Sequence, residues 1–244
     1  CACLRACAQY VEMTAELTHG QTFEAHVLHL RSYGESDRIL QVLSRDQGRL
    51  GVIAKGARAS KRRFAGILDH FVTLRLHVRP NRGLWRLQAA DLVELRPTIR
   101  QHWERYVRAH VLCEFAASLS NEGERAPETY QILQHSLDAL DAGHLDQAAN
   151  AYAQFFCQAG ITPPLDECLG CKAKRVVVVG INAERGTVCQ RCCQEEPTPE
   201  SRLLALTGHS FCTAENATPV EALAMTWLEY HLGRPLRVRS LLAN

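Results

Sequence analysis

The segment LDHFVTLRLHV, residues 68–78, decides the fold of the first part of the chain. From Leu68 to Val78 every second residue is apolar, with the single exception of His70, and most of the residues in between are polar. A period of two is the side-chain period of a β-strand that buries one face. The segment therefore predicts a strand, and a strand of this kind needs partner strands beside it.

Four similar runs surround this segment, at residues 23–33, 38–44, 49–55 and 84–95. Turn sequences separate them, with DQG at 46–48 and PNRG at 80–83. Five strands joined by short turns within about 75 residues are typical of a small closed barrel. We expect an oligonucleotide-binding (OB) barrel, while strand counting leaves an SH3-like barrel open as the alternative.

Helical spacing replaces the period of two at Pro97. A first helix is predicted from there, with Thr98 as its N-cap. Its apolar stripe consists of Ile99, Trp103, Tyr106, Val107, His110, Val111 and Phe115. Two further helices are predicted, one from Pro127 to near Gly143 and one over about 145–159. Each apolar stripe needs a surface to pack on, so the three helices predict a bundle.

The last part of the chain predicts two more helices, each opened by a Thr-Pro pair that is typical of an N-cap followed by a first-turn proline. The pairs are Thr198-Pro199 and Thr218-Pro219, and Thr218 with Glu221 fits a capping box. We expect these helices to end near Gly208 and Gly233 and to return to the bundle.

Two CxxC pairs precede these last helices. Cys168 and Cys171 form the first pair, and Cys189 and Cys192 form the second, with 17 residues between the pairs. This spacing is typical of four-cysteine zinc sites, in which each pair points two thiolates at one ion. Val176–Val179 is expected as a buried strand of the hairpin that returns the chain. Four thiolates fill a tetrahedron, so the sequence predicts one structural Zn²⁺ ion with no open position for catalysis.

The other cysteines bear on this prediction. A redox pair or an iron–sulfur cluster also uses CxxC pairs, but two pairs at this spacing favour zinc. Cys193 is either a spectator or an alternative to Cys192, and the CxxC frame favours Cys192. Cys113 and Cys157 lie in helical stripes and are predicted core residues. The total of eleven cysteines, without a secretory signal in residues 1–20, predicts metal ligation in a reducing compartment.

Positive charge is concentrated in the predicted barrel. Residues 21–100 contain 15 Lys and Arg against 7 Asp and Glu, a net charge of +8, while residues 101–244 contain 12 against 17. Such a concentration favours a polyanionic partner over an ordinary solvated surface. The densest part is a connection at residues 55–66, which we call the basic loop. The predicted DNA-binding residues are Arg38, Lys55, Arg58, Lys61, Arg62 and Arg63.

Other residue patterns bear on bases and on catalysis. Four aromatic residues of the barrel could stack on bases, with core packing as the alternative: Tyr33, Phe64, Phe71 and Trp85. The sequence has no GxxxxGK[ST] loop, no GxSxG elbow and no HExxH motif. His26 and His29 stand at odd separation on a predicted strand, so they are expected on opposite faces and not as a metal pair. We therefore expect no enzymatic activity.

Three stretches occur in a specific order. The first is YGESDRIL at 33–40, followed by Gly48 and by KGAR at 55–58. The second is GITPPL at 160–165, which leads into the CxxC pairs, and the third is LRVRSLL at 236–242. Together they resemble the bacterial DNA repair protein RecO family, from near residue 24 through most of the rest of the chain.

The resemblance implies an N-terminal OB-fold, a helical middle and a zinc module. It implies a DNA repair and homologous recombination mediator that binds single- and double-stranded DNA and anneals complementary strands without catalytic turnover. It also implies two protein partners. With RecR the protein would assist the loading of RecA onto DNA coated by single-stranded-DNA-binding protein (SSB), and it would contact the acidic C-terminal tail of SSB. The rival interpretation is a zinc-containing interaction adaptor that does not bind DNA directly.

The chain is thus predicted to be an α+β protein with a five-stranded OB-type barrel, a helical bundle and a four-cysteine zinc module. The expected segments are an N-terminal extension at 1–20, the OB-fold DNA-binding domain at 21–97, a helical domain at 98–160, the zinc module at 161–196, and C-terminal helices packing on the helical domain at 197–244. No apolar run is long enough to span a bilayer, and the expected location is the cytoplasm, at the nucleoid.

Overall fold

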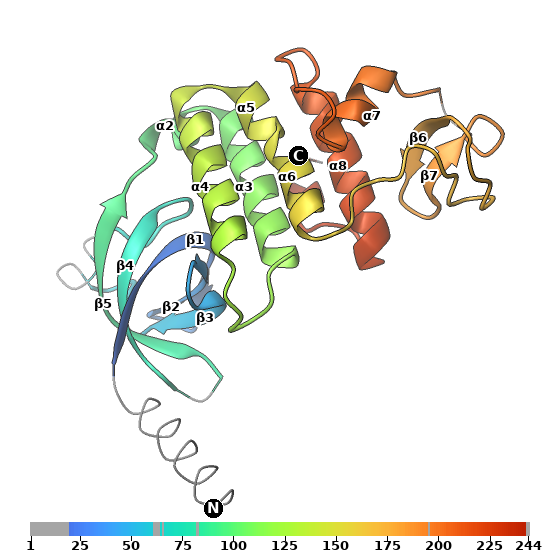
Figure 1. The fold of residues 1–244 in the computed structure, drawn as a ribbon. Coiled ribbons are helices and arrows are strands. Elements are labelled where there is room, and N and C mark those ends of the chain that lie inside the picture. The colour runs from blue at the N-terminus through green and yellow to red at the C-terminus, as the bar shows by residue number, and fades with distance from the viewer. Residues whose placement is uncertain (1–19, 61–63, 65, 82, 195, 243–244) are drawn as a thin grey trace, which may run out of the picture. The chain divides into compact units, whose positions relative to one another are not determined.

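The computed structural model describes residues 20–60, 64, 66–81, 83–194 and 196–242. Its chain forms two compact units (Figure 1). The first contains the residues up to Leu95 together with Ser120–Tyr130, and the second contains Arg96–Leu119 and the residues from Gln131 onward. The chain therefore leaves the first unit, returns to it for a short stretch, and leaves it again.

The first unit is a closed five-stranded barrel. Its strands are β1 (Gln21–Tyr33), β2 (Asp37–Ser44), β3 (Gly48–Ala54), β4 (Thr73–Arg79) and β5 (Trp85–Glu94). They are hydrogen-bonded in the order β1-β2-β3-β5-β4, and β1 pairs with β4 to close the barrel. All neighbours are antiparallel except β3 and β5, which pair in parallel through Val52 with Trp85 and Ile53 with Arg86. This is the closure of an OB-fold, so the OB prediction is confirmed.

The strand predicted from Leu68 begins only at Thr73. Phe71 has φ of 65°, a left-handed conformation that a strand cannot contain. Leu68, Phe71 and Val72 are nevertheless buried in the barrel. Their backbone crosses the bend of β1, where Val27 donates to the Val72 carbonyl at 3.0 Å and Phe71 donates to the Val27 carbonyl at 3.2 Å. The alternation of apolar residues before Thr73 thus indicates buried side chains and not a β-strand.

A bulge in β1 corrects the expectation for the two histidines. The register of β1 against β2 shifts between Val27 and His29, so Leu28 is an extra residue. The extra residue brings His26 and His29 to the same face of the strand instead of to opposite faces. The His29 ring lies 5.7 Å from the ring of His70, centroid to centroid.

The returning stretch Ser120–Tyr130 is built into the barrel at the β2–β3 turn. The Arg49 amide donates to the Asn121 carbonyl at 3.4 Å, and the Gly123 amide donates to the Arg49 carbonyl at 3.1 Å. Gly48, at the start of β3, has φ of 64°, and a β-carbon added to it would lie 1.8 Å from the Glu124 carbonyl oxygen. Only glycine allows both the backbone conformation and this close approach.

We expect Gly48→Ala to lower the free energy of unfolding of the barrel by about 2–4 kcal/mol, because left-handed strain adds to overpacking against Glu124. Gly56→Ala is the matched control, since Gly56 has φ of 67° but no atom within 4 Å of an added β-carbon. The control should cost only about 1–2 kcal/mol of strain. Urea unfolding of both variants measures the difference, and equal losses would show that the contact with Glu124 contributes nothing.

The second unit is mainly helical. The helices of the described residues are α2 (Pro97–Gln101), α3 (Trp103–Ser118), α4 (Pro127–Ala142), α5 (Leu145–Ala149), α6 (Ala151–Gln158), α7 (Glu200–Leu206), α8 (Ala217–Leu232) and α9 (Arg239–Leu242). A two-stranded hairpin, β6 (Val178–Asn182) and β7 (Gly186–Cys189), lies between α6 and α7 in the sequence. As predicted, α4 starts at Pro127, and α8 stops at Gly233, whose φ is 62°.

Two predicted helices are broken. The first splits at His102, which has extended backbone angles, into α2 and α3. Thr98 is not the N-cap. Instead, the Asp141 carboxylate from α4 accepts the backbone amides of Thr98 and Ile99 at 2.8 and 3.2 Å. The third predicted helix splits at Asn150 into α5 and α6, and the Asn150 side chain accepts the Cys212 amide at 2.7 Å.

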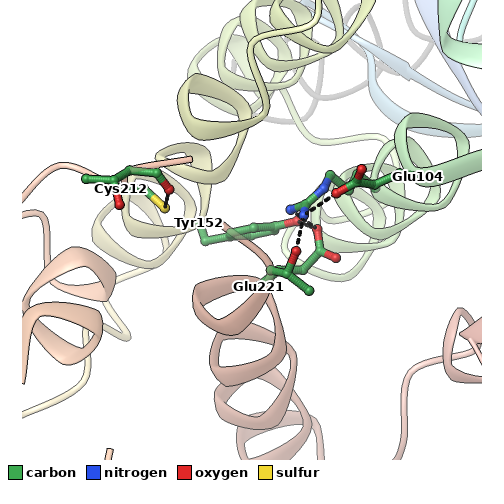
Figure 2. A network of polar contacts seen from close by, with 7 residues as sticks. Glu104, Tyr152, Cys212 and Glu221 are labelled. Atoms are coloured by element: carbon green, nitrogen blue, oxygen red, sulfur yellow. Dashed lines mark hydrogen bonds and ion pairs between the residues drawn. The ribbon is translucent and has the colours of Figure 1, made fainter. Parts of the chain in front are cut away.

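The predicted capping box of α8 is also wrong, because its two side chains have tertiary partners. Helix α8 begins at Ala217, so Thr218 is already inside it. Arg108 of α3 donates to the Thr218 hydroxyl at 2.6 Å, while Tyr152 of α6 donates to the Glu221 carboxylate at 2.5 Å. Figure 2 shows the side chains of Glu104, Tyr152 and Glu221 meeting from three helices. The network joins α3, α6 and α8 in one core.

Candidate metal centre and barrel surface

The β6–β7 hairpin brings the two CxxC pairs together. Cys189 is the last residue of β7, and the backbone of Cys168 pairs with the returning chain through its amide, which donates to the Ala173 carbonyl at 2.9 Å. The sulfur atoms of Cys168, Cys171, Cys189 and Cys192 all lie within 4.8 Å of one another. The structure therefore places the four predicted ligands at one point.

The sulfur spacing fits a tetrahedral metal site. The Cys171 and Cys189 sulfurs are 3.9 Å apart. Four thiolates around a zinc ion, at Zn–S of about 2.3 Å, have their sulfurs about 3.8 Å apart. A disulfide bond would need the two sulfurs to be about 2.05 Å apart, so Cys171 and Cys189 would have to move to form one. The four cysteines could hold one metal ion.

Backbone amides favour the thiolate form of Cys168. Burial opposes ionisation of Cys168, but the amides of Cys171 and Cys189 point at its sulfur at 3.5 and 3.3 Å and lower its pKa to about 6. The hydrogen bond with Cys171, followed by desolvation, raises the pKa of Cys192 to about 12. Without a cation the cluster resists full ionisation. A bound divalent cation would stabilise all four thiolates.

Cys193 is not one of the four clustered sulfurs. Its amide and that of Cys192 both donate to the Cys189 carbonyl at 2.9 Å, and its side chain is half-buried against the cluster. A β-carbon added to Gly180 would be 3.5 Å from the Cys193 sulfur, which places that sulfur beside β6. The geometry favours Cys192 as the ligand.

Two details of the sequence interpretation near this centre are wrong. The expected buried strand at Val176–Val179 begins only at Val178, and Val177 is 79% exposed. The helical-stripe argument predicts core positions for Cys113 and Cys157, and only Cys113 is buried. Cys157 stands near the end of the short helix α6, where its face no longer meets the core.

On the barrel, three of the predicted DNA-binding residues surround the β1–β2 turn. Lys55 pairs with the Asp37 carboxylate at 2.6 Å, and the Arg58 guanidinium donates to the Glu35 carbonyl at 3.1 Å. Arg38 donates to the Leu68 carbonyl at 2.8 Å. The other three predicted contacts, Lys61, Arg62 and Arg63, lie outside the described residues.

Asp37 organises the start of the basic loop. Its carboxylate accepts both Lys55 and the Gly56 amide, and these two hydrogen bonds, Lys55 first, lower its pKa. The Arg58 amide donates to the Ser36 carbonyl at 2.9 Å. The loop is thus fastened at its first residues to the β1–β2 turn. Sequence reasoning did not assign Asp37 this role, although the residue lies inside the YGESDRIL stretch.

Two of the four barrel aromatics are buried. Phe64 and Phe71 are 2% and 1% exposed and therefore cannot stack on bases from their present positions. Trp85 is half-buried, with its ring edge-on to Phe23 at 6.4 Å. Tyr33 remains 49% exposed at the end of β1. Of the four candidates, Tyr33 alone is about half exposed to solvent.

These features define the class: an OB-fold barrel joined in one chain to a helical unit that carries a four-cysteine candidate metal centre. No helix in the part of the chain that the structure describes is both long and apolar enough to cross a membrane.

Comparison with known proteins assigns the family. A model described as "Recombination protein O N terminal" matches residues 19–96, and one described as "Recombination protein O C terminal" matches residues 100–240. The chain is 31% identical to the DNA repair protein RecO of Myxococcus xanthus over 91% of this chain and 96% of that protein. It is 33% identical to that of Anaeromyxobacter sp. strain K and 31% identical to that of Bifidobacterium longum subsp. infantis, each over 88% of this chain. The chain belongs to the RecO family of DNA repair proteins.

Proposed function

We propose that the protein is a mediator of DNA repair and homologous recombination that binds single- and double-stranded DNA and anneals complementary strands. The observation that carries the proposal is the basic loop on an OB barrel, fastened at its start by Lys55 to Asp37 and by Arg58 to the Glu35 carbonyl. A loop that is held in place at its start and rich in cations in its middle can bind the phosphate backbone of DNA. Such binding depends on charge and not on base sequence.

Annealing by this surface requires no active site. Two DNA strands repel each other through their phosphates, and a cationic surface lowers that repulsion while it holds both strands. Base pairing then supplies the free energy. The net charge of +8 in residues 21–100 is consistent with such a surface. The proposal therefore includes no catalytic turnover and places the protein in the cytoplasm, at the nucleoid.

The metal ion is proposed to be one structural Zn²⁺. Four cysteine sulfurs at tetrahedral spacing are the ligand set of closed zinc sites, and soft thiolates favour zinc over hard cations such as Mg²⁺. All four positions would be filled by protein, which leaves none for a reacting water.

Family membership supports two partners: RecR, with which the protein would assist RecA loading onto SSB-coated DNA, and the acidic C-terminal tail of SSB.

Replacing Lys61, Arg62 and Arg63 together with alanine tests this proposal. We expect weaker binding to DNA, slower annealing of complementary oligonucleotides, and a salt dependence of log K that is flatter by up to about 0.7–0.9 per lost phosphate contact. Binding titrations at several salt concentrations, and annealing with and without SSB, measure these effects.

A matched control removes three exposed cations from the other unit: Lys172, Lys174 and Arg175. It changes net charge equally, so only the loop variant should flatten the slope. Unchanged affinity and slope in the loop variant would exclude the basic loop as the contact. A complete lack of DNA affinity in the unmodified chain at moderate salt would instead favour the interaction adaptor.

A further inference from the structure

Three rings follow one another along α3 on a face that the helical core does not use. Trp103 is 63% exposed, and Tyr106 and His110 are half-buried. The rings of Trp103 and Tyr106 are stacked, with centroids 5.9 Å apart and planes 21° apart. The Tyr106 and His110 rings meet edge to face at 4.7 Å. We call these three residues the aromatic strip.

The strip corrects the predicted apolar stripe of this helix. Val107, Val111 and Phe115 are buried as expected, together with Ile99 of α2, whereas the three rings lie on a second, outward stripe with i, i+3, i+7 spacing. Ring pairs at this spacing stabilise a helix only weakly. Burying a tryptophan side chain would yield several times more. Helix stability therefore does not account for a tryptophan left in water at this place.

Two rings of the strip have an orientation that suits stacked bases. At 1.5 Å rise per residue, Trp103 to Tyr106 spans about 4.5 Å and Tyr106 to His110 about 6 Å along the helix axis. The Trp103 and Tyr106 rings are nearly parallel, as neighbouring stacked bases are, whereas the His110 ring stands edge-on to Tyr106. The near-parallel pair is therefore the part of the strip that suits base stacking.

The charged side chains beside the strip are Arg100, Arg105 and Glu104. Arg100, which precedes Trp103, is exposed. Arg105 donates to the Thr98 hydroxyl at 3.3 Å and to the Asp141 carbonyl at 3.1 Å. The neighbouring acid, Glu104, is paired with Arg108 at 3.1 Å. A ring surface flanked by guanidinium groups complements a nucleic-acid strand, which offers base faces and phosphates together.

We propose that the aromatic strip is a second nucleic-acid contact, located on the helical unit, that stacks on the unpaired bases of single-stranded DNA. The inference rests on the proposed DNA-binding function and adds to it a means of distinguishing unpaired from paired DNA. Bases within a duplex are stacked on each other and offer no free face, so the strip acts on single strands alone. An apolar protein partner is the weaker fit, because the rings have cations beside them and α3 has no other exposed large apolar residue.

Trp103→Ala in the full chain tests the inference, with Phe211→Ala as the matched control. Phe211 is also a ring of the second unit and is 87% exposed, so its loss changes the same kind of surface elsewhere. We expect Trp103→Ala to weaken binding of a thymidine oligonucleotide about 5- to 150-fold, the range for one lost stacking contact. Affinity for blunt duplex of the same length should change less than about twofold. Trp103→Phe, which keeps a ring face, should restore most of the single-strand affinity.

The salt dependence separates this contact from the basic loop. The ring carries no charge, so Trp103→Ala should leave the slope of log K against log salt unchanged, while the loop variant flattens it. Unchanged single-strand affinity, or equal losses for single strand and duplex, would overturn the aromatic strip as a base-stacking contact while leaving the basic loop standing. If the unmodified chain binds no DNA, the proposed function fails and the strip falls with it.

Discussion

Replacing Cys168 with serine is expected to abolish binding of the proposed Zn²⁺ ion and to unfold the segment around β6 and β7. Cys168 is fully buried, and its sulfur accepts two backbone amides in addition to its place in the four-sulfur cluster. The cluster is covered by few apolar residues, chiefly Val176 and Val188, so little else holds this segment together. In isolated zinc-finger peptides, metal binding supplies on the order of 10 kcal/mol of folding free energy. Among the described residues, no change outside the four clustered cysteines should have so large a local effect.

Metal analysis of the purified variant measures the first part of this result, as a fall from one zinc per chain toward none. Limited proteolysis measures the second, as new cleavage within 161–196. Cys193→Ser is the matched control, since Cys193 is adjacent to the cluster but is not among its four sulfurs. The control should keep its zinc. Equal zinc loss in the two variants would contradict the choice of Cys192 over Cys193.

Replacing Arg108 with alanine should have the second largest effect, a loss of about 3–5 kcal/mol in the free energy of unfolding. Arg108 is 3% exposed and Glu221 is 6% exposed, with 3.4 Å between the guanidinium and the carboxylate. Without Arg108 the buried Glu221 would keep only the Tyr152 hydroxyl (Figure 2). An uncompensated buried carboxylate is costly, which is why removing one partner of a buried pair destabilises far more than the pair itself stabilises.

Glu104→Ala is the control for this variant. Glu104 also pairs with Arg108, but its side chain is 60% exposed, so its loss should cost less than about 1 kcal/mol. Urea unfolding at neutral pH compares the two variants. Similar losses would show that the Arg108–Glu221 contact is no more important than an exposed ion pair.

The loss in Arg108→Ala should depend on pH. Burial raises the pKa of Glu221 above its ordinary value, and Arg108 and Tyr152 oppose that rise. A carboxyl whose folded-state pKa is raised binds its proton more tightly in the folded state, so stability from this group increases as pH falls through the folded-state pKa. Removing Arg108 raises that pKa further. The free energy of unfolding that Arg108→Ala loses should therefore be smaller at about pH 5 than at pH 7. Glu104→Ala keeps Arg108 and the other carboxylates except Glu104, so measuring it at both pH values shows how much of the change comes from those groups.

Local signals in the sequence predicted which four cysteines cluster and where most strands lie. The CxxC spacing determines which sulfurs can meet, because each pair needs only a tight turn and the hairpin between them. Strand positions followed from alternation, and the closed order β1-β2-β3-β5-β4 agrees with the expected OB barrel. The alternation failed around Phe71. This residue has a left-handed conformation and is buried, and β4 begins only after it, at Thr73.

Two of the errors share a cause, which is that partners distant in sequence override local preference. Asp141 caps α2 from another helix, so Thr98 is not needed as a cap. Arg108 and Tyr152 occupy the side chains of Thr218 and Glu221, so no capping box forms. The outward position of Trp103 could not be predicted either, because helical spacing alone does not say which of two stripes meets the core.

The return of Ser120–Tyr130 to the barrel has a consequence for how the protein emerges during synthesis. The ribosome delivers all five strands, then α3, and only afterwards the backbone of Glu124 that packs on Gly48. The barrel therefore lacks the stretch that packs on its β2–β3 turn until Tyr130 has left the exit tunnel, by which time a helix of the second unit has already been made. The segments of the two units are therefore synthesised alternately. A fragment that ends near residue 97 would lack the stretch Ser120–Tyr130, which packs on the barrel.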